Sequence, residues 1–254
     1  ACTTDTDQLF TTDVQTTSVA TYQLNNATTS IPSNTYPGTA SNITYAAGKF
    51  GNAAVFNGSG SNISLPLSSW LSSTSAKSCS VWFKTSATGG GNRAIISDYG
   101  SGASYNFDCF LIPTDGKIFL VTNRGTQYYT SSINSFNDGQ WHLAVIVDDI
   151  PNGNTKLYVD NNQEISISTG SGTVASTVLY IGTYGTGYYW DGSIDQVRIF
   201  NTALSQAAIT ALYNETTTTA QSASVDYQLA NPNSIAYYKM SDATDQLGNY
   251  NGTA

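Results

Sequence analysis

Short runs of apolar residues recur along most of this chain of 254 residues, and glycine, asparagine and aspartate separate them. In the segment SCSVWFK, residues 78–84, Cys79, Val81 and Phe83 occupy every second position, which is typical of a strand with one buried face. Similar runs bounded by turn residues predict strands at residues 18–24, 52–58, 62–67, 93–98, 104–112, 117–123, 140–149, 155–160, 163–168, 176–182 and 192–200.

Two dipeptides between these runs indicate hairpins. Asp115-Gly116 is a strong signal for a tight turn, and Asn161-Asn162 predicts a second turn. About a dozen short strands with turns between them favour an antiparallel two-sheet sandwich or jelly roll. Strands do not alternate with helices along the chain, which excludes the common α/β folds.

The last predicted strand has a break in its alternation. Ile194, Val197 and Ile199 are apolar, but the phase changes between them at Asp195 and Gln196. Such a break is typical of a bent or bulged strand.

A single short helix is predicted directly after that strand. Ser205 is a good N-cap, and Leu204 before it can pack against Ile209 as a hydrophobic staple. Ile209, Leu212 and Tyr213 then form a one-sided apolar stripe. Because so short a helix is not stable alone, we expect it to lie over sheet edges or to close one end of the sandwich.

Composition divides the chain into four parts. Residues 1–17 and 216–233 are Thr-, Ser- and Asn-rich and are interpreted as a tail and a linker. Residues 18–215 form the predicted domain. Residues 234–254 parallel residues 18–40, and both segments end in Gly-Thr-Ala, so we interpret 234–254 as the first strand of a second, incomplete module. An unpaired strand invites pairing with a neighbouring subunit, which makes homo-oligomers by strand exchange a further hypothesis.

Charge restricts the classes of partner. Charged residues make up only 10% of the chain and the formal net charge is −8, so nucleic acid and anionic membranes are unfavourable partners. No apolar run approaches the roughly 20 residues that a membrane-spanning helix needs. A surface made of Ser, Thr, Asn and Gly suits extracellular and virion β-proteins. Three cysteines leave open whether Cys79 and Cys109 form a disulfide.

Several blocks carry a resemblance to a known family. They are AGKFGNAAVFNGSGSNISLP (47–66), SVWFK (80–84), QWHLAVIVDD (140–149), KLYVDNNQ (156–163) and WDGSIDQVRIFNTALSQAAITALYNE (190–215). In this order they resemble laminin-G-like jelly-roll modules of the concanavalin A-like lectin/glucanase superfamily. The Thr- and Asn-rich flanks and the repeated start of the module are similar to tandem modules of phage virion proteins and marine bacterial adhesins. The resemblance implies two curved antiparallel sheets in which the first and last strands lie side by side.

The resemblance also implies a structural Ca²⁺ ion. Asp195 matches the family's ligand in the closing strand, Asn57 and Gly58 match an early turn, and Asn25 matches the end of the first strand. Ca²⁺ accepts carbonyl as well as carboxylate oxygens. The alternative is that Asp195 only accepts hydrogen bonds from the adjacent turn.

A surface for a ligand is predicted from aromatic residues near glycines. The stretch YIGTYGTGYYWDG carries Tyr184, Tyr188, Tyr189 and Trp190, whose faces could stack on sugar rings. Tyr128 and Tyr129, with Asp98, Tyr99 and Arg124, are further candidates for the same rim. The alternative is that Trp190 belongs to the core and the tyrosines only decorate a sheet.

The pattern of carboxylates argues against catalysis. Retaining glucanases of the superfamily need two carboxyl groups about 5 Å apart on one strand face. Here neither Glu164 nor Glu215 has an acidic partner at alternating spacing. Asp148 and Asp149 are adjacent and point to opposite faces of a regular strand. His142, the single histidine, is interpreted as structural.

The sequence thus predicts a non-enzymatic structural or adhesive module of a virion, such as a phage appendage or capsid decoration, that binds a partner subunit or a surface glycan. The alternative is a carbohydrate-binding module of a secreted bacterial adhesin, and a more distant one is a glucanase-like hydrolase. The predicted location is accordingly a virion or the extracellular space.

Overall fold

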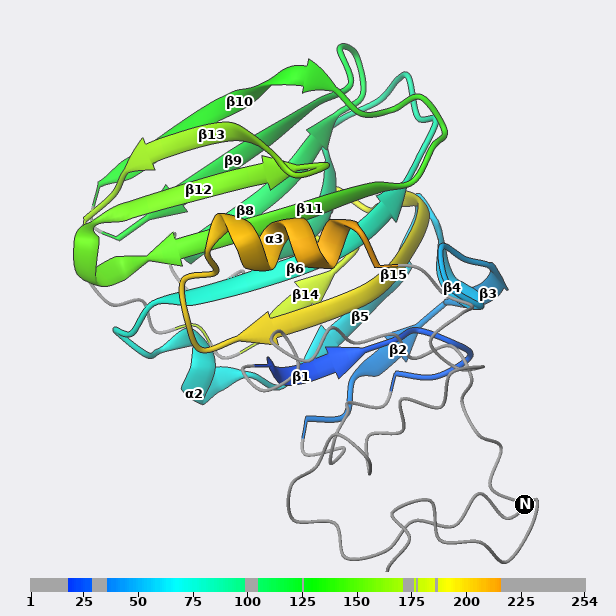
Figure 1. Ribbon diagram of the computed structural model, residues 1–254. Helices are drawn as coiled ribbons and strands as arrows, with labels where there is room; N and C mark the ends of the chain where they lie inside the picture. Colours follow the sequence, from blue (N-terminus) through cyan, green and yellow to red (C-terminus); the bar gives the residue numbers. More distant parts are fainter. Residues whose placement is uncertain are drawn as a thin grey trace, which may run out of the picture. The chain divides into compact units, whose positions relative to one another are not determined.

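The computed structural model describes residues 18–28, 36–98, 105–124, 126–170, 176, 178–185 and 187–215. Two antiparallel sheets pack face to face in this part of the chain, as the sequence predicts (Figure 1). The predicted tail, the linker and the repeat at 234–254 lie outside the described residues, so strand exchange stays a prediction. No helix among these residues is long and apolar enough to cross a membrane.

One sheet has eight strands. In spatial order it runs β13 (Asn162–Ser168), β12 (Asn154–Val159), β11 (His142–Asp149), β6 (Lys77–Lys84), β15 (Asp191–Phe200), β4 (Asn52–Asn57) and β3 (Thr44–Ala47). The eighth strand, β1 (Ser18–Tyr22), pairs with the second half of β15, where Tyr22 lies opposite Val197. The first and last strands of the described domain are therefore neighbours, as the resemblance implies.

The other sheet has seven strands. Its order is β10 (Gln127–Ser135), β9 (Lys117–Asn123), β8 (Tyr105–Ile112), β7 (Arg93–Ser97), β14 (Leu179–Ile181), β5 (Asn62–Leu65) and β2 (Thr39–Ser41). Three of the strands in the two sheets were not predicted, namely β2, β3 and β10. Their side chains are mostly exposed and lack the apolar alternation that marks the other strands.

The main core fills the space between the sheets. On β6, Cys79, Val81 and Phe83 point into it, as their alternation predicts, and Trp82 points to the outer face. Cys79 and Cys109 are both buried there and both are free thiols. Burial raises the pKa of each thiol above its usual range, so both behave as small apolar side chains.

The predicted bulge in the closing strand is confirmed. The pairing of β15 with β6 shifts register between Asp195 and Arg198. Gln196, inside this shift, has a φ of 46°, a left-handed conformation that few non-glycine residues adopt. The bulge lets the first half of β15 pair with β4 and the second half with β1.

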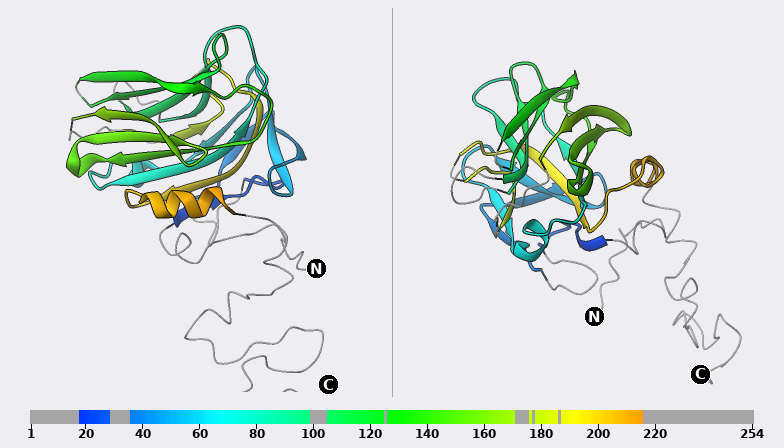
Figure 2. Two further views of the ribbon diagram at one scale, coloured as in Figure 1. Left: turned by 45° about the horizontal axis from the view of Figure 1, so that its top comes forward. Right: turned by 90° about the vertical axis from the view of Figure 1, so that its left-hand side faces the viewer.

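The predicted helix is present as α3 (Gln206–Tyr213), and its N-cap is confirmed. The hydroxyl of Ser205 accepts a hydrogen bond from the Ala208 N–H at 3.2 Å. Its position differs from our expectation, because α3 covers the outer face of the eight-stranded sheet rather than an edge or an end (Figures 1 and 2). Its apolar stripe packs on a second core that includes Trp82, Leu143 and Phe200. That sheet face is strongly apolar, and among the described residues the helix, together with Phe50, shields it from water.

A hairpin turn anchors the helix. The β12–β13 turn is formed by Asp160 and Asn161, with φ values of 48° and 70°, one residue earlier than predicted. The Asn161 side-chain carbonyl accepts hydrogen bonds from Gln206 Nε2 at 2.7 Å and from Thr210 Oγ1 at 2.8 Å. Two shorter helical segments, α2 (Ser68–Leu71) and a 3₁₀ turn at Ile150–Asn152, were not predicted.

Buried charges lie at the ends of β6 and β9. The Arg124 guanidinium forms an ion pair with Asp148, and both side chains are almost completely buried. Lys77 Nζ donates to the carbonyls of Trp70 and Leu71 at 2.9 Å and to that of Ser73 at 3.0 Å. Burial lowers the pKa of Lys77 to about 8. These charges are internal, and they serve the structure rather than a surface site.

Candidate functional site

Aromatic side chains gather on the outer face of the seven-stranded sheet, which α3 does not cover. We call the set Tyr129, Phe119, Phe110, Tyr184 and Tyr188 the aromatic row. The rings of Tyr129 and Phe119 have centroids 5.6 Å apart. Phe110 lies 5.4 Å from Tyr184 and 5.8 Å from Tyr188, and those two tyrosines are 5.8 Å apart.

The pairing of β8 with β9 connects the two halves of the aromatic row. Phe110 on β8 lies directly opposite Phe119 on β9, and their side chains share the outer face. The row therefore crosses β10, β9 and β8 and continues onto the loop that follows β14. Because neighbouring strands are about 4.8 Å apart, the row is long enough to contact a chain of several small rings rather than a single ring.

The ends of the aromatic row are its most exposed parts. Tyr129 is 64% exposed and Tyr188 is 49% exposed, whereas Phe110 is 7% exposed beneath the two loop tyrosines. Phe110 thus supports the row, and the tyrosines offer open ring faces. Exposed aromatic rings on a rigid sheet lose little conformational entropy when they bind.

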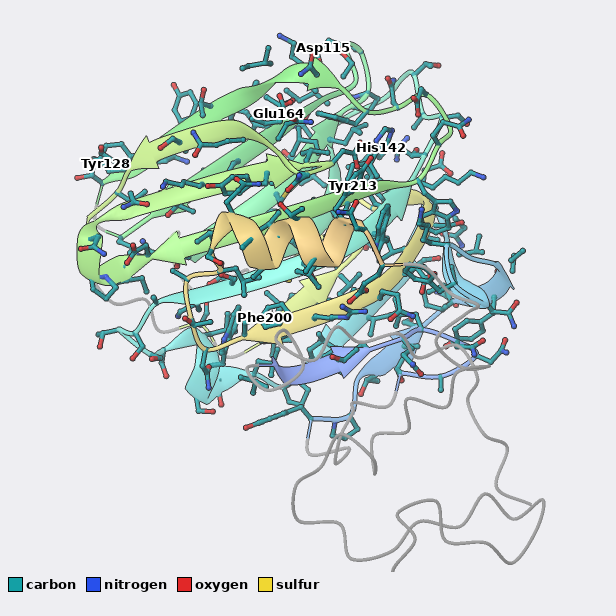
Figure 3. The ribbon with its side chains drawn as sticks, viewed as in Figure 1. Asp115, Tyr128, His142, Glu164, Phe200 and Tyr213 are labelled. Carbon is teal, nitrogen blue, oxygen red and sulfur yellow. The ribbon has the colours of Figure 1, made fainter. Side chains whose placement is uncertain are left out.

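Strand geometry separates the two tyrosines that the sequence places together. Tyr128 and Tyr129 are adjacent on β10, so their side chains point to opposite faces. Tyr129 faces Phe119, and Tyr128 lies opposite Thr122, a buried residue. Figure 3 shows Tyr128 near the start of β10, at the other end of the sandwich from His142. Tyr128 is therefore not part of the aromatic row.

The loop before β15 is held by main-chain hydrogen bonds. Tyr184 and Gly187 exchange two hydrogen bonds of 3.0 Å, and the Ala94 N–H donates to the Tyr188 carbonyl at 2.7 Å. Tyr188 has a φ of 52°, and this conformation turns its side chain out of the strand path. Tyr189 is only partly exposed and belongs to the same loop.

The prediction that Trp190 contributes to the contact surface is wrong. Trp190 is fully buried in the main core, where its ring packs edge-on against Phe83 with centroids 5.8 Å apart. The neighbouring glycines suggested an open loop, but Trp190 already precedes β15 with its side chain between the sheets. The rim prediction fails for Asp98 and Arg124 too, because both side chains are buried. Tyr99 lies outside the described residues.

A polar cleft of about 420 Å³ lies at the end of the sandwich where β15 begins. We call it the end cleft, and it is lined by residues 84–89, Arg93, Gly139 and 191–193. Its walls are joined by hydrogen bonds from the Thr85 hydroxyl to the Asp191 carbonyl, at 2.6 Å, and from the Gly139 N–H to the Thr85 carbonyl, at 2.9 Å. Gly192 is required there, because a Cβ would lie 2.2 Å from the Lys84 carbonyl oxygen and its φ is 143°.

The residues predicted to bind Ca²⁺ lie in two places. Asp195 lies beside the turn between β3 and β4, where its Oδ2 accepts a hydrogen bond from the Phe50 N–H at 2.9 Å. Asn25 is close to this turn, since its Oδ1 accepts from the Asn52 N–H at 3.2 Å. Asn57 and Gly58 lie at the other end of β4, where Asn57 is opposite Asp191. Four residues of strand separate Asp191 from Asp195, about 13 Å, so the four predicted ligands do not form one coordination sphere.

The buried carboxyl group of Asp195 is only partly hydrogen-bonded. Its carboxyl is fully buried, and its Oδ1 has no hydrogen-bond partner among the described residues. Burial raises the pKa of Asp195 to about 7, although hydrogen bonds from Phe50 and its neighbours counteract the shift. The hydrogen bond to the turn, which was the alternative interpretation, is present. Calcium binding at this carboxylate stays a prediction.

The Asp98–Asp108 pair and His142 carry the acid and base groups that catalysis would need. The Asp98 N–H donates to Asp108 Oδ1 at 3.2 Å, and burial, followed by the charge of Asp98, raises the pKa of Asp108 well above its usual value. Both carboxyls are at most 1% exposed, so they do not present an acid and a nucleophile to a substrate. His142 bonds Asp160 through Nδ1 at 2.6 Å and Asp138 through Nε2 at 3.0 Å, which is the structural role predicted for it.

Sequence reasoning did not predict that Phe110, Phe119 and Arg93 take part in these two sites. The two phenylalanines sit in the runs NFDCFLI and KIFLV, whose strong apolar character indicates a core. Their alternation with Cys109, Leu111, Ile118 and Leu120 was the available signal, because it places them on the opposite face. Arg93 carries no such signal, since the end cleft is assembled from four separate segments.

The fold and these sites are those of a two-sheet jelly-roll module. A family model described as the concanavalin A-like lectin/glucanases superfamily matches residues 56–210, and the chain belongs to this family. A search of curated protein sequences gives no match.

Solved structures share the fold. Domain 4 of AbnA, a GH43 extracellular arabinanase from Geobacillus stearothermophilus solved in complex with arabinotriose, is 27% identical, with a TM-score of 0.63. The match covers 78% of this chain and 98% of that domain. The receptor-binding domain of the botulinum neurotoxin C/D mosaic serotype is 18% identical with a TM-score of 0.61, and the match covers 78% of this chain and 51% of that one. The binding domain of botulinum neurotoxin DC, solved with rat synaptotagmin II, is 12% identical with a TM-score of 0.59, and the match covers 79% of this chain and 52% of that one.

Proposed function

We propose that this domain is a carbohydrate-binding module and that the aromatic row is its contact surface. The observation that carries the proposal is the arrangement of Tyr129, Phe119, Tyr184 and Tyr188 across the uncovered sheet face, with open ring faces at both ends. Sugar rings have apolar faces that stack on aromatic side chains. A row of rings on neighbouring strands suits an extended oligosaccharide.

The related arabinanase domain supports this proposal. It matches the described domain over nearly its whole length, and it was solved with a neutral trisaccharide. Binding rather than hydrolysis is proposed for the present chain, because the close carboxylates Asp98 and Asp108 are buried. A glucanase-like activity is the alternative, and release of reducing sugar from β-glucans would establish it.

The low content of charged residues supports a role outside the cytoplasm. We propose that the module is a structural or adhesive part of a virion or of a secreted bacterial adhesin. In either setting the aromatic row would attach the larger assembly to a surface glycan or to a glycosylated partner. A virion protein and a secreted adhesin would have different neighbouring genes, but the chemistry of the site would be the same in both.

Two adjacent tyrosines provide a matched test of the contact surface. Glycans that bind the domain are first identified on a glycan array, and their affinity is then measured by isothermal titration calorimetry. We expect Tyr129→Ala to weaken binding about tenfold, the upper range for one aromatic contact. Tyr128→Ala removes the same ring from the other face of β10 and should leave the affinity unchanged. Equal effects of the two variants, or no binding to any glycan, would contradict the proposal.

A further inference from the structure

The lining of the end cleft has more positive than negative side chains. Lys84 and Arg93 line it together with one carboxylate, Asp191. Neither cation forms an ion pair among the described residues. The formal net charge of the chain is −8, so the cleft reverses the sign of the average surface. A local cluster of this kind attracts anions over a Debye length of about 8–10 Å.

Arg93 is held by long hydrogen bonds. Its Nη1 donates to the carbonyls of Gly58, at 3.4 Å, and Tyr189, at 3.3 Å, and its Nη2 donates to that of Gly89, at 3.5 Å. Its Nε is buried without a hydrogen-bond partner. A guanidinium in good geometry makes N–H···O bonds of about 2.9 Å, so Arg93 has unused donor capacity. A small rotation would present two of its N–H groups side by side, which is the arrangement that matches a carboxylate.

The end cleft adjoins the aromatic row. Arg93 and Ala94 are consecutive on β7, and Ala94 packs in the apolar cluster beneath the row while Arg93 lines the cleft. The segment from Tyr188 to Asp191 borders both, because the Tyr188 carbonyl bonds Ala94 and the Tyr189 carbonyl bonds Arg93. A chain lying on the row can therefore place one of its units in the cleft.

The end cleft is open on one side and held by hydrogen bonds on the other. Gly89 and Gly91 would meet no atom within 4 Å if they carried a Cβ, so the connection between β6 and β7 leaves the space above them open. The opposite wall is fixed, since Thr85 is bonded to Asp191 and the Asn137 amide donates to the Ala87 carbonyl at 2.9 Å. A site with fixed walls and an open entrance needs little rearrangement to bind.

We propose that the end cleft recognises the carboxylate of an acidic saccharide, with Arg93 as the principal binding residue and Lys84 as a second cation. This inference rests on the proposed carbohydrate-binding function and names the class of ligand as uronic-acid-containing glycans. The aromatic row stacks on the sugar rings, and the cleft selects the acidic unit. The negative charge of Asp191 would repel a second carboxylate in the end cleft. The cleft therefore binds only one acidic group.

The test compares each acidic oligosaccharide with its own methyl ester, which has the same rings without the charge. Hexasaccharides of galacturonic and mannuronic acid are titrated calorimetrically in both forms. We expect at least one free acid to bind about tenfold or more tightly than its ester, and added salt to reduce the difference. Arg93→Met should abolish the preference, so that the free acid and its ester bind this variant with equal affinity. Lys84→Met should reduce the preference by about threefold, as suits an exposed cation.

Lys156→Met is the matched control, because Lys156 is a partly exposed cation on β12 that does not line the end cleft. If Arg93→Met unfolds, Arg93→Gln replaces it, since glutamine removes the charge and keeps a polar side chain in the cleft. Equal binding of acids and esters, or an unchanged preference in the Arg93 variants, overturns the inference and leaves the proposed function intact. Binding of neutral glycans without binding of acidic ones also overturns the inference and leaves the proposed function intact. Failure to bind any neutral or acidic glycan overturns both.

Discussion

The N–H of Ala94 donates a hydrogen bond of 2.7 Å to the carbonyl of Tyr188. This bond fixes an exposed loop to the first residues of a buried strand. It sets the position of the Tyr188 ring over Phe110 and, one residue away, that of the Arg93 guanidinium. The two halves of the proposed site therefore share one backbone contact.

Replacement of Tyr188 tests the loop end of the aromatic row. Tyr188→Asn removes the ring, and asparagine tolerates the left-handed conformation at φ 52° better than alanine does. We expect glycan affinity to fall by about threefold to tenfold, as suits the loss of one stacked ring, with little change in melting temperature. Tyr213→Ala is the control, because Tyr213 is on α3 over the other sheet and stacks on Trp82. A variant at Tyr188 with wild-type affinity would remove the loop from the site.

The buried pair Arg124–Asp148 should respond asymmetrically to substitution. Arg124→Met leaves the Asp148 carboxylate buried without its counter-charge, and we expect unfolding free energy to fall by about 3–5 kcal/mol. The double variant Arg124→Met/Asp148→Leu removes both charges and should be more stable than the single variant. Urea denaturation measures both. A double variant that is less stable than Arg124→Met would show that hydrogen bonds such as that from Thr155 to Asp148 dominate.

Because the carboxyl of Asp195 is buried, we expect the unfolding free energy to fall as the pH rises. Burial raises its pKa to about 7 from an ordinary value of 3.8, so between these values the folded protein retains a proton that the unfolded chain loses. Its contribution is fully present below about pH 4 and is lost as the pH passes 7. We expect Asp195→Asn, which is neutral throughout, to remove a dependence on the order of 3 kcal/mol between pH 5 and pH 8.

The pH profile has a second contributor. Burial lowers the pKa of His142, but the hydrogen bonds and charges of Asp160 and Asp138 more than reverse this effect and raise it. A raised histidine pKa stabilises the fold below about pH 6.5, and the effect is lost at higher pH. Asp195→Asn should therefore keep a smaller decline above pH 6. A flat wild-type profile from pH 5 to pH 8 would contradict both assignments.

The calcium prediction can be tested at the same carboxylate. The Oδ1 atom of Asp195 has no hydrogen-bond partner among the described residues, and a bound Ca²⁺ would be coordinated by this oxygen. We expect millimolar Ca²⁺ to raise the melting temperature at pH 8, EDTA to reverse the rise, and Asp195→Asn to abolish it. A rise that persists in the variant would place the ion elsewhere. No response to Ca²⁺ in the wild-type protein would contradict the prediction.

Asn161 should contribute measurably to the attachment of α3. Asn161→Gly keeps the left-handed turn and the main-chain carbonyl that also accepts from Gln206, but it removes the side-chain acceptor for Gln206 and Thr210, at an expected cost of about 1–2 kcal/mol. A double-mutant cycle with Thr210→Ala separates the side-chain bond from the change in the unfolded chain, and a coupling energy above about 0.5 kcal/mol is expected. Additive single effects would show that the contact contributes little.

The sequence predicts much of this fold because local pattern and tertiary position agree. The phase break at Asp195 and Gln196 predicts the bulge, and Ser205 predicts the helix start, since both signals lie within a few residues. The placement of α3 could not be predicted in this way, because it depends on Trp82 and Leu143, which come from distant strands. Strand β10 escaped prediction because an exposed edge strand needs no apolar alternation.

The site was less predictable for a related reason. Tyr184 and Tyr188 could be chosen from the sequence because glycines surround them, but the same reasoning wrongly included Trp190. Phe110 and Phe119 join the aromatic row only through the register of β8 with β9. The end cleft requires four segments to meet, and no single segment indicates it.

The cover that α3 provides gives the domain two unlike sides. The helix lies against one sheet (Figure 2), the outer face of the other sheet carries the aromatic row, and the charged end cleft lies at one end of the sandwich. Under the proposed function, the orientation of such a domain in a larger assembly would decide whether its contact surface can reach a ligand. Fixed to a scaffold by its helical side, it would point every ligand contact outward, and mounted the other way it would serve only as a spacer.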